Sequence, residues 1–560
     1  MFCRQTPRLL VLLISSLALC ACLRKASEGV DTIAVLPLED DSAASAPDGF
    51  GAAAPYLIQW QLDGSPNVYV FAAADPNAAA EAHAGRVLEG WYQRRNGALE
   101  VHVTVRDATR RRIASSNIRT GDAASVLNDI AVSLRPGSRL FKHSDDDAMR
   151  MMGLALVGGS SAQPQFLQAE LTSPAPFVPA VLPFASALVD AGRNAQAAEL
   201  LARVHPGGGI DAARLKFLEA RISGDALAQR NALTDVVRLA PADPLARSRL
   251  ADLQFNTRQW AAAAASYVAL SRMQPWEGTV FNQLAYARAW QHDLTGARQA
   301  IADYRRADPA QAPNAADSLG EIEWDFGHFA DAEKNFLEAS QGDIVLLRGN
   351  DLLKAAEARW MRGDTGGADR LFHRYASWRR AAGDPELPVR EAQWLHLTGR
   401  VQAAEAALRP LANNAAALAQ LSFWALLAGQ RDEAHQLAER AIAAPAAPDV
   451  RNTAALCAFY SLPSASATEW ETRSREAFQA APGVRATVLG TALVLDGHKA
   501  EAVAPLSTAL AAKPPNEDGA VRGLLLRAGG PSSLRWPMPM PFYNGDPTFD
   551  AASFPMWRQR

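Results

Sequence analysis

The chain has 560 residues, which is too many for one hydrophobic core, so two or more domains are expected. Hydrophobic residues make up 49% of it and charged residues 21%, which excludes wholesale disorder. The formal net charge of −3 gives no bulk basic field to attract nucleic acid, and four cysteines are too few for a scaffold built on disulfides.

The first 22 residues have the pattern of a secretory signal. Arg4 and Arg8 supply positive charge, and the uncharged run LLVLLISSLALCA follows at residues 9–21. This run is shorter than the roughly 20 residues that a helix needs to cross a bilayer. A removed signal is therefore favoured over a transmembrane anchor, and we expect the chain to be exported.

The end of this signal resembles a bacterial lipobox, in which a small residue precedes the cysteine that becomes lipidated. Ala21 stands before Cys22, and Cys20 at the −2 position departs from the pattern. The resemblance implies a lipid anchor on Cys22. Leu23 after this cysteine implies a periplasmic protein attached to the outer membrane. An ordinary cleaved signal is the alternative.

Residues 30–136 are predicted to form a small α/β domain. Asn96-Gly97 separates two apolar runs and is the strongest short signal for a hairpin. In residues 98–106 apolar and polar side chains alternate, so one face of this strand is expected to be buried. The expected order is β-α-β-α-β-β-β-α, over residues 32–38, 51–62, 67–72, 76–84, 87–94, 98–106, 112–118 and 122–134.

This order resembles the TolB-like amino-terminal domain and its FlgO-like relatives, which occur in bacterial envelope proteins. The stretches that carry the resemblance are IAVLP at residues 33–37, LEG at 88–90 and VRD at 105–107. The motifs are hydrophobic patterns and turns. The resemblance implies an α/β fold and brings no active-site residues with it.

Residues 145–515 are predicted to repeat as helical hairpins. Small residues recur twelve positions apart, glycines recur between them, and Pro241, Pro275 and Pro309 follow at a spacing of 34. The small pairs are Ala185/Ala197, Ala251/Ala263, Ala285/Ala297, Gly320/Ala332, Ala356/Ala368, Ala392/Ala404, Ser422/Ala434 and Gly490/Ala502. The expected turn glycines are Gly192, Gly224, Gly327, Gly363, Gly399, Gly429 and Gly497.

This register strongly resembles the tetratricopeptide repeat (TPR) family, in which the small positions allow two helices to cross closely. The resemblance implies about ten to eleven hairpins stacked into an α-solenoid, including a degenerate hairpin at 145–175. Two units depart from the pattern. One has Phe217 and Gln229 at its small positions, and the other has Cys457 and Glu469.

No pattern in the sequence indicates catalysis. H-E-x-x-H, G-x-x-x-x-G-K-[ST] and G-x-S-x-G are all missing from the sequence, and the ten histidines are scattered without the spacing of metal ligands. Cys457 is expected to be a buried small residue in its repeat. We therefore predict no enzyme activity, no cofactor and no metal.

Four aromatic residues suggest a binding surface. Phe255, Trp324 and Trp360 fall at the twelfth position of successive repeats, and Trp290 falls at the thirteenth. In the tetratricopeptide family these positions tend to face the concave groove, so the four residues could form a stripe that holds an extended peptide. Ordinary packing between repeats, or against the neighbouring domain, is the alternative.

The C-terminal tail, residues 516–560, has another composition. Residues 531–560 contain six prolines and six aromatic residues, which is too apolar for a simple spacer. An extended segment docked on the protein's own surface is the first interpretation. A ligand for another protein is the second.

The predicted fold class is α+β, with the α/β domain followed by a helical superhelix. The predicted function is a scaffold in the bacterial envelope, anchored to the membrane by lipid, which binds envelope proteins or peptides and no nucleic acid. This prediction rests on two points: a helical superhelix offers a large extended surface, and the sequence contains no catalytic motif. The alternative is a sensor whose α/β domain binds a small ligand.

Overall fold

The computed structural model describes residues 30–540 apart from 43–47, 109–111, 144, 344, 412, 480–481, 514–517 and 539. Residues 1–29, which include Cys22, and residues 541–560 of the tail lie outside the described part. The chain divides into two compact units, Met1–Gln254 with Val268–Gln274, and Phe255–Tyr267 with Pro275–Arg560. Each unit is described separately.

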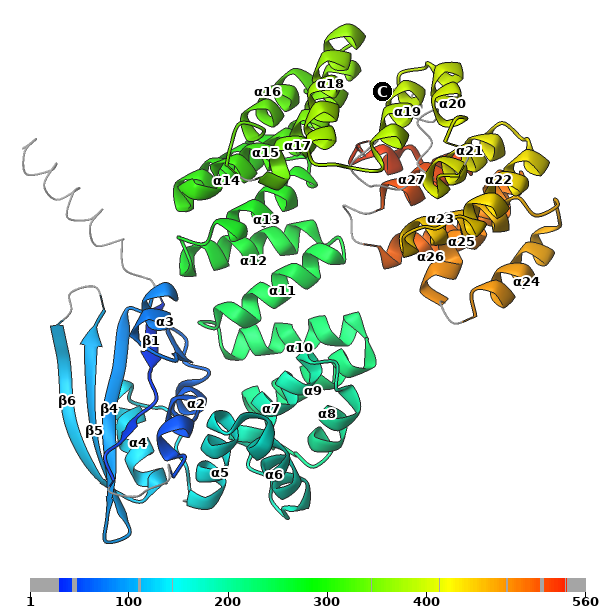
Figure 1. Cartoon of the computed structure of the whole chain (residues 1–560). Coiled ribbons are helices and arrows are strands. Elements are labelled where there is room, and N and C mark those ends of the chain that lie inside the picture. Colours follow the sequence, from blue (N-terminus) through cyan, green and yellow to red (C-terminus); the bar gives the residue numbers. More distant parts are fainter. Residues whose placement is uncertain are drawn as a thin grey trace, which may run out of the picture. The chain divides into compact units, whose positions relative to one another are not determined.

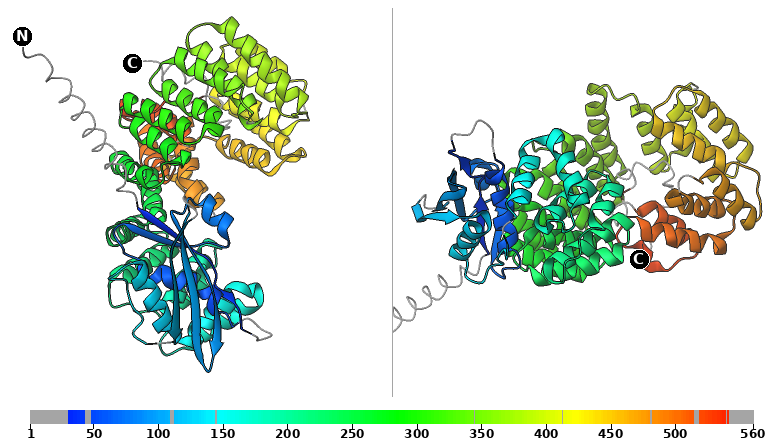
Figure 2. Two further views of the ribbon diagram at one scale, coloured as in Figure 1. Left: turned by 90° about the vertical axis from the view of Figure 1, so that its left-hand side faces the viewer. Right: turned by 90° about the horizontal axis from the view of Figure 1, so that it is seen from below.

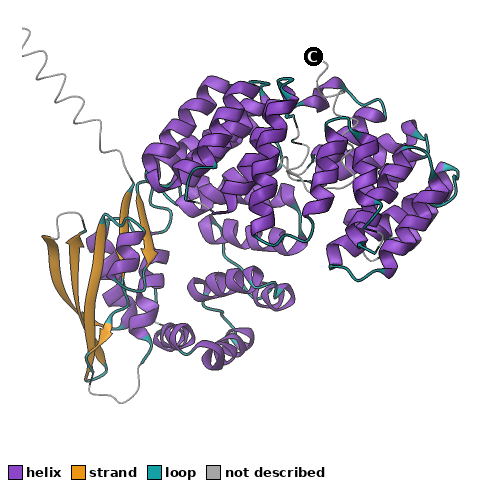
Figure 3. Ribbon diagram, turned by 45° about the horizontal axis from the view of Figure 1, so that its top comes forward, coloured by secondary structure: helices purple, strands orange, loops and turns teal. Residues whose placement is uncertain are grey.

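Unit 1 begins with a mixed sheet whose strand order is β3-β1-β4-β5-β6 (Figures 1 and 3). β1 is parallel to β3 and β4, while β5 is antiparallel to its two neighbours, β4 and β6. A short strand, β2, pairs with β4. The strands are β1 (Asp31–Val35), β2 (Glu39–Asp40), β3 (Val68–Ala72), β4 (Arg86–Arg95), β5 (Ala98–Asp107) and β6 (Arg112–Gly121).

The helices of the α/β domain are α2 (Phe50–Leu62), α3 (Pro76–Glu81) and α4 (Ala123–Leu134). The main core lies between the sheet and helices α2 and α4, which pack on the side of Ile33 and Val35. Ala34, which points to the opposite side, is buried with Ala79 of α3. The strands lie in front of most helices of the domain in Figure 2, left. The apolar side of β5 is buried as its alternation predicts, with Leu99 and Val101 fully buried. The predicted order of elements is confirmed. Only β2, two residues long, was not predicted.

Helical hairpins follow from residue 146 onward. The helices pack mostly as consecutive pairs joined by short connections, as the predicted hairpins require. In unit 1 these are α5 (Asp146–Val157), α6 (Gly159–Thr172), α7 (Val178–Asp190), α8 (Asn194–Leu201), α9 (Gly209–Ser223) and α10 (Ala226–Leu239), and α11 (Pro244–Asn256) and α12 (Trp260–Met273) cross the boundary between the units.

Unit 2 continues the same pattern up to residue 512, and two further short helices follow (Figure 2). Its helices are α13 (Gly278–Ala289), α14 (Leu294–Ala307), η1 (Pro309–Gln311), α15 (Ala312–Asp325), α16 (Phe329–Ala339), α17 (Val345–Met361), α18 (Thr365–Ala381), α19 (Leu387–Leu397), α20 (Val401–Leu408), α21 (Ala415–Leu427), α22 (Arg431–Ala443), α23 (Pro448–Tyr460), α24 (Ala467–Ala477), α25 (Pro482–Leu495), α26 (Lys499–Ala512), α27 (Gly519–Arg527) and η2 (Ser532–Arg535).

The small residues of the predicted register are the crossing points of the hairpins. All eight pairs are buried. At Gly320, a Cβ atom would lie 2.5 Å from the ring of Phe336, which is itself fully buried. Gly327, with a φ of 75°, provides the left-handed residue between α15 and α16.

The departure predicted at Cys457 and Glu469 has a physical reason. Cys457 is fully buried at the crossing point, as expected. Glu469 is exposed, because the connection from α23 to α24 spans residues 461–466 and shifts the register of the second helix. Trp470 and Ser474 are buried in place of Glu469.

Candidate partner-binding site

The four aromatic residues singled out in the sequence lie at equivalent places in unit 2. Phe255 and Trp360 are in the last turns of α11 and α17, Trp324 is in the last turn of α15, and Trp290 caps the end of α13. The rings of Phe255 and Trp290 are 5.0 Å apart, and Nε1 of Trp290 donates to the carboxylate of Asp325, at 3.4 Å. The structure therefore places the four aromatics along one edge of successive hairpins.

Trp324 and Trp360 share a hydrophobic cluster with the protein's own tail. Met538 and Met540 are buried in this cluster, with 9% and 7% of their surfaces exposed. Trp324 is fully buried. Met538 and Met540 thus dock on the same unit, in agreement with the first interpretation of the tail. The predicted start of the tail at residue 516 is wrong, because residues 519–527 form α27, whose Val521 and Leu525 belong to the core of the preceding helices. From here on, the tail means the residues that follow α27. We call the surface formed by Trp290, Trp324, Asp325, Phe326 and Trp360 the tail-binding face.

The main chain of the tail is held by side chains of unit 2. Nε1 of Trp324 donates to the carbonyl oxygen of Met538, at 3.2 Å. The amide of Met538 donates to the carboxylate of Asp325. Arg522, on α27, donates to the carbonyl oxygens of Leu534 (3.1 Å) and Pro537. These bonds recognise backbone atoms, so they fix the path of the segment without selecting its side chains.

The aromatic ring of Trp536 also packs against unit 2. It lies 4.6 Å from His292 and 4.7 Å from Phe326, measured between ring centroids. Aromatic pairs at this separation contribute about 0.5–1.5 kcal/mol beyond the area that they bury.

Arg522 is held by a buried ion pair. Its guanidinium binds Asp518, which is fully inaccessible to solvent. Asp518 also binds Arg258, at 2.6 Å, and Arg258 donates to the carbonyl oxygens of Leu510 (3.2 Å) and Lys513 (3.4 Å). The last helices of unit 2 are thereby tied to its first residues, which positions Arg522 against the tail.

Burial raises the pKa of Asp325 well above its usual value, although the bonds from Trp290 and Met538 oppose the rise. A raised pKa favours the uncharged carboxyl. Asp325 therefore presents a buried hydrogen-bonding group to the segment bound beside it.

A second polar cluster lies on α13, α15 and α17. The phenol of Tyr286 donates to Glu321 at 2.6 Å, and Nζ of Lys354 binds Asp317 and Glu321, each at 2.6 Å. Burial and the neighbouring Asp317 raise the pKa of Asp351 to about 9, with Lys354 opposing the rise. The ammonium group of Lys354 thus contacts several buried carboxyl groups, and protonation of Asp351 reduces the repulsion among these carboxyl groups.

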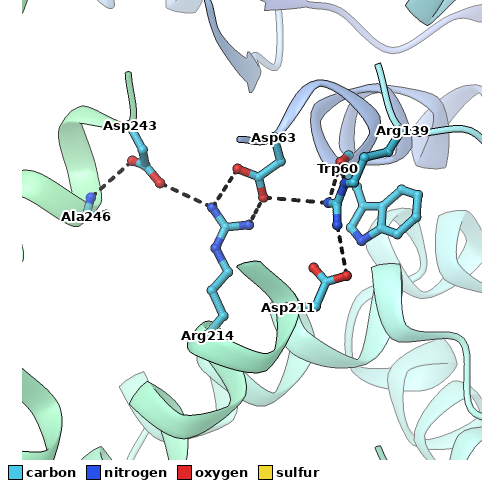
Figure 4. Close-up of polar contacts among 7 residues, drawn as sticks. All are labelled: Trp60, Asp63, Arg139, Asp211, Arg214, Asp243 and Ala246. Atoms are coloured by element: carbon cyan, nitrogen blue, oxygen red, sulfur yellow. Dashed lines mark hydrogen bonds and ion pairs between the residues drawn. The ribbon is translucent and has the colours of Figure 1, made fainter. Parts of the chain in front are cut away.

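In unit 1 an ionic network joins the α/β domain to the first hairpins (Figure 4). Arg214, on α9, binds Asp63, which follows α2, and also Asp243, at 3.2 Å. Arg139 binds Asp211 at 2.9 Å and stacks 3.9 Å above the ring of Trp60. Burial raises the pKa of Asp63, and Arg214 opposes the rise. The network fixes the domain against these helices.

A cavity of about 370 Å³ lies beside this network. Tyr56 and Trp60 on α2 line it together with Leu182 on α7 and Phe217 on α9. Its wall is mostly apolar. This size is within the range of small-molecule sites.

Two other predictions concern metal and thiol chemistry. Among the described residues, Glu323, His328 and Asp331 are close enough to hold a metal ion. Both carboxylate oxygens of Glu323 already accept from Arg298, at 2.6 and 2.8 Å, so this group is better described as an ion pair. Cys457 is buried, with its Sγ 3.7 Å from the carbonyl oxygen of Ala419, and is not placed as a reactive thiol.

Sequence reasoning singled out Trp290, Trp324 and Trp360 and missed the polar contacts around them, while Phe255 packs against Trp260, Tyr267 and Trp290, as the alternative of packing between repeats predicts. Asp325 follows Trp324 directly but carries no local signal of a role. Arg522 and Asp518 lie four residues apart, which is the spacing of a helical ion pair. Their contacts with the tail are tertiary and could not be read from that spacing.

No helix among the described residues has the length and apolar character to cross a membrane.

No protein-family model and no curated protein matches the chain. Several solved structures resemble it weakly. Naa15/Naa10 bound to HypK-THB is 13% identical over 70% of this chain and 67% of that chain, with a TM-score of 0.28. The human IFIT1 dimer with m7Gppp-AAAA is 14% identical over 66% and 91%, with a TM-score of 0.28. The P58(IPK) TPR domain is 14% identical over 60% and 91%, with a TM-score of 0.18. TM-scores this low do not indicate a shared arrangement of the helices.

Proposed function

We propose that this chain is an exported scaffold of the bacterial cell envelope that binds a segment of a partner protein on the tail-binding face. A lipid on Cys22 would hold it at the outer membrane, with its repeats in the periplasm. We assign it no reaction. The resemblance of the α/β domain to TolB-like domains and the lipobox-like end of the signal support the compartment.

One observation carries the binding role: the tail-binding face already holds an extended peptide. Trp324, Asp325 and Arg522 contact backbone atoms of residues 534–538, and aromatic and apolar side chains surround Met538. Recognition of an extended segment by main-chain bonds, with pockets for side chains, is a general way to bind peptides. Helical repeat surfaces offer the area that such binding needs.

The test is in-cell cross-linking of a tagged, full-length chain, followed by mass spectrometry of the membrane fraction. We expect a small set of envelope proteins in near-stoichiometric amounts. Their recovery should fall in Trp324→Ala, a variant whose helical circular-dichroism signal must match that of the wild type. Recovery of the same proteins from Trp324→Ala, with the fold intact, would contradict binding at this face.

Anchoring is tested separately by Cys22→Ser. We expect this variant to move from the membrane fraction to the soluble periplasmic fraction and to lose incorporation of labelled palmitate. If Cys22→Ser remains in the membrane fraction, the proposed lipid anchor is wrong, whatever the result for the partner.

The cavity in unit 1 favours a second candidate function, the binding of a small ligand. It is lined by the α/β domain and by the hairpins of the same unit, so a ligand there would stabilise the contact between them. A ligand that binds only the folded state raises its melting temperature. Screening small amphipathic compounds for such a rise, and repeating any positive result with the cavity filled by Ala187→Trp, tests this candidate.

A further inference from the structure

Every second residue of the docked tail contacts the tail-binding face. Trp536 packs against His292 and Phe326, and Met538 and Met540 are buried beside Trp324. A two-residue period is that of an extended chain. Trp536 itself has extended backbone angles, with φ −111° and ψ 137°.

The four main-chain bonds to Leu534, Pro537 and Met538 depend on the path of the segment and not on its side chains. A segment of another protein with the same path would make the same bonds. The bond to Asp325 needs an N–H at the position of Met538, so proline is excluded there. At the position of Pro537 only the carbonyl oxygen is used.

The arginine that contacts the main chain of the tail is already paired within unit 2. Arg522 is paired with Asp518, and Asp518 is also paired with Arg258. Met538 and Met540 are buried in an apolar cluster, so a charged side chain at either position would lose most of its hydration. Burying such a charge is costly, so charged residues are selected against at both positions.

We propose that the partner contributes an extended segment, uncharged and without proline at the position of Met538, with an apolar side chain at every second residue, and that this segment binds by displacing residues 536–540 of the tail. The inference rests on the function proposed above and defines the class of partner. The tail is then an internal competitor that resembles the partner's segment.

Competition follows from the covalent link. A flexible tether gives a bound segment an effective concentration on the order of millimolar, so a free segment of equal affinity must reach that concentration to replace it. Substitutions that weaken docking of the tail should therefore strengthen binding of a free peptide by at least tenfold. The same substitutions placed in the free peptide should weaken it.

The test uses a fluorescein-labelled peptide of residues 530–540 and the full chain, with binding followed by fluorescence anisotropy. The first chain variant carries Met538→Asp and Met540→Asp together. The second carries Met538→Pro, which removes the N–H that Asp325 accepts and adds no charge. We expect both variants to bind the peptide at least tenfold more tightly than the wild-type chain. Adding Trp324→Ala to either variant should remove this gain.

A matched peptide with Met538→Pro serves as the control and should bind at least tenfold more weakly than the unmodified peptide. Equal binding of the two peptides would overturn the inference. So would equal affinity of the wild-type chain and of both tail variants, with unchanged thermal unfolding. Failure of in-cell cross-linking to recover a partner would count against the proposed function, and the peptide titration decides displacement independently of it.

Discussion

Replacing Trp324 by phenylalanine tests the docking of the tail most sharply. The substitution keeps an aromatic ring in the buried cluster and removes the Nε1–H that donates to the carbonyl oxygen of Met538, at 3.2 Å. A hydrogen bond of this kind contributes about 1 kcal/mol net, which corresponds to an approximately fivefold increase in the undocked fraction of the tail.

Trypsin reports this fraction directly. Arg535 precedes Trp536 in the docked segment, and the next tryptic site is Arg558, so cleavage at both releases a fragment of residues 536–558 with a distinctive mass. When opening and closing are fast compared with cleavage, the cleavage rate follows the population of the open form. We therefore expect release of this fragment from Trp324→Phe to be about fivefold faster than from the wild type, as the loss of one hydrogen bond dictates.

The matched control is Trp470→Phe. Trp470 is also fully buried, and its Nε1 donates to Asp496 at 2.6 Å. This variant loses a comparable bond without changing the bond to Met538, so the release of residues 536–558 should stay close to the wild-type rate. Equal release from both variants would refute the reasoning, because the effect would then come from general loss of packing.

Three further predictions concern stability. Gly320→Ala should lower the unfolding free energy of unit 2 by about 1–3 kcal/mol, since its Cβ would lie 2.5 Å from the buried ring of Phe336. Asp351→Asn should raise the melting temperature more at pH 8 than at pH 5. The folded pKa of about 9 lies above the ordinary 3.8, so the wild type loses stability as the pH rises through this window, by about 1 kcal/mol per pH unit. Arg214→Met should destabilise unit 1 by roughly 3 kcal/mol, because buried Asp63 loses its close partner and keeps Arg139 at 3.9 Å.

Each of these has its own check by thermal or denaturant unfolding. Gly207→Ala, where no atom lies within 4 Å of the added carbon, is the control for Gly320→Ala and should be nearly neutral. The check for Asp351→Asn is the difference between its melting temperature and that of the wild type. If this difference does not grow from pH 5 to pH 8, Asp351 ionises normally in the folded protein. Full recovery of stability in Arg214→Met combined with Asp63→Asn would support the ion-pair explanation, and no recovery would contradict it.

Much of the fold was predictable because it is specified locally. The Asn96-Gly97 turn, the alternation in β5 and the small residues twelve apart all act between near neighbours in the sequence. The length of the connection before α24 was not predictable, since Glu469 and Trp470 are equally compatible with that helix until tertiary packing selects one.

The site was predictable only in part, for the same reason. The repeat register places Phe255, Trp290, Trp324 and Trp360 at one edge of the hairpins. Trp324 and Met538 are 214 residues apart, and nothing local joins them. Burial of Asp325 and its bond to the tail depend on that long-range contact, so the polar half of the site could be found only from the structure.

Site-specific photo-cross-linking in cells tests the central claim most directly. A photoreactive p-benzoylphenylalanine at Trp360 lies beside the cluster that holds Met538 and Met540, and one at Val401, which is 42% exposed on α20, is the control. We predict a discrete adduct with an envelope protein from position 360, stronger when Met538→Asp and Met540→Asp release the tail, and none of that adduct from position 401. No adduct from position 360 in either chain, or the same adduct from both positions, would contradict partner binding at the tail-binding face.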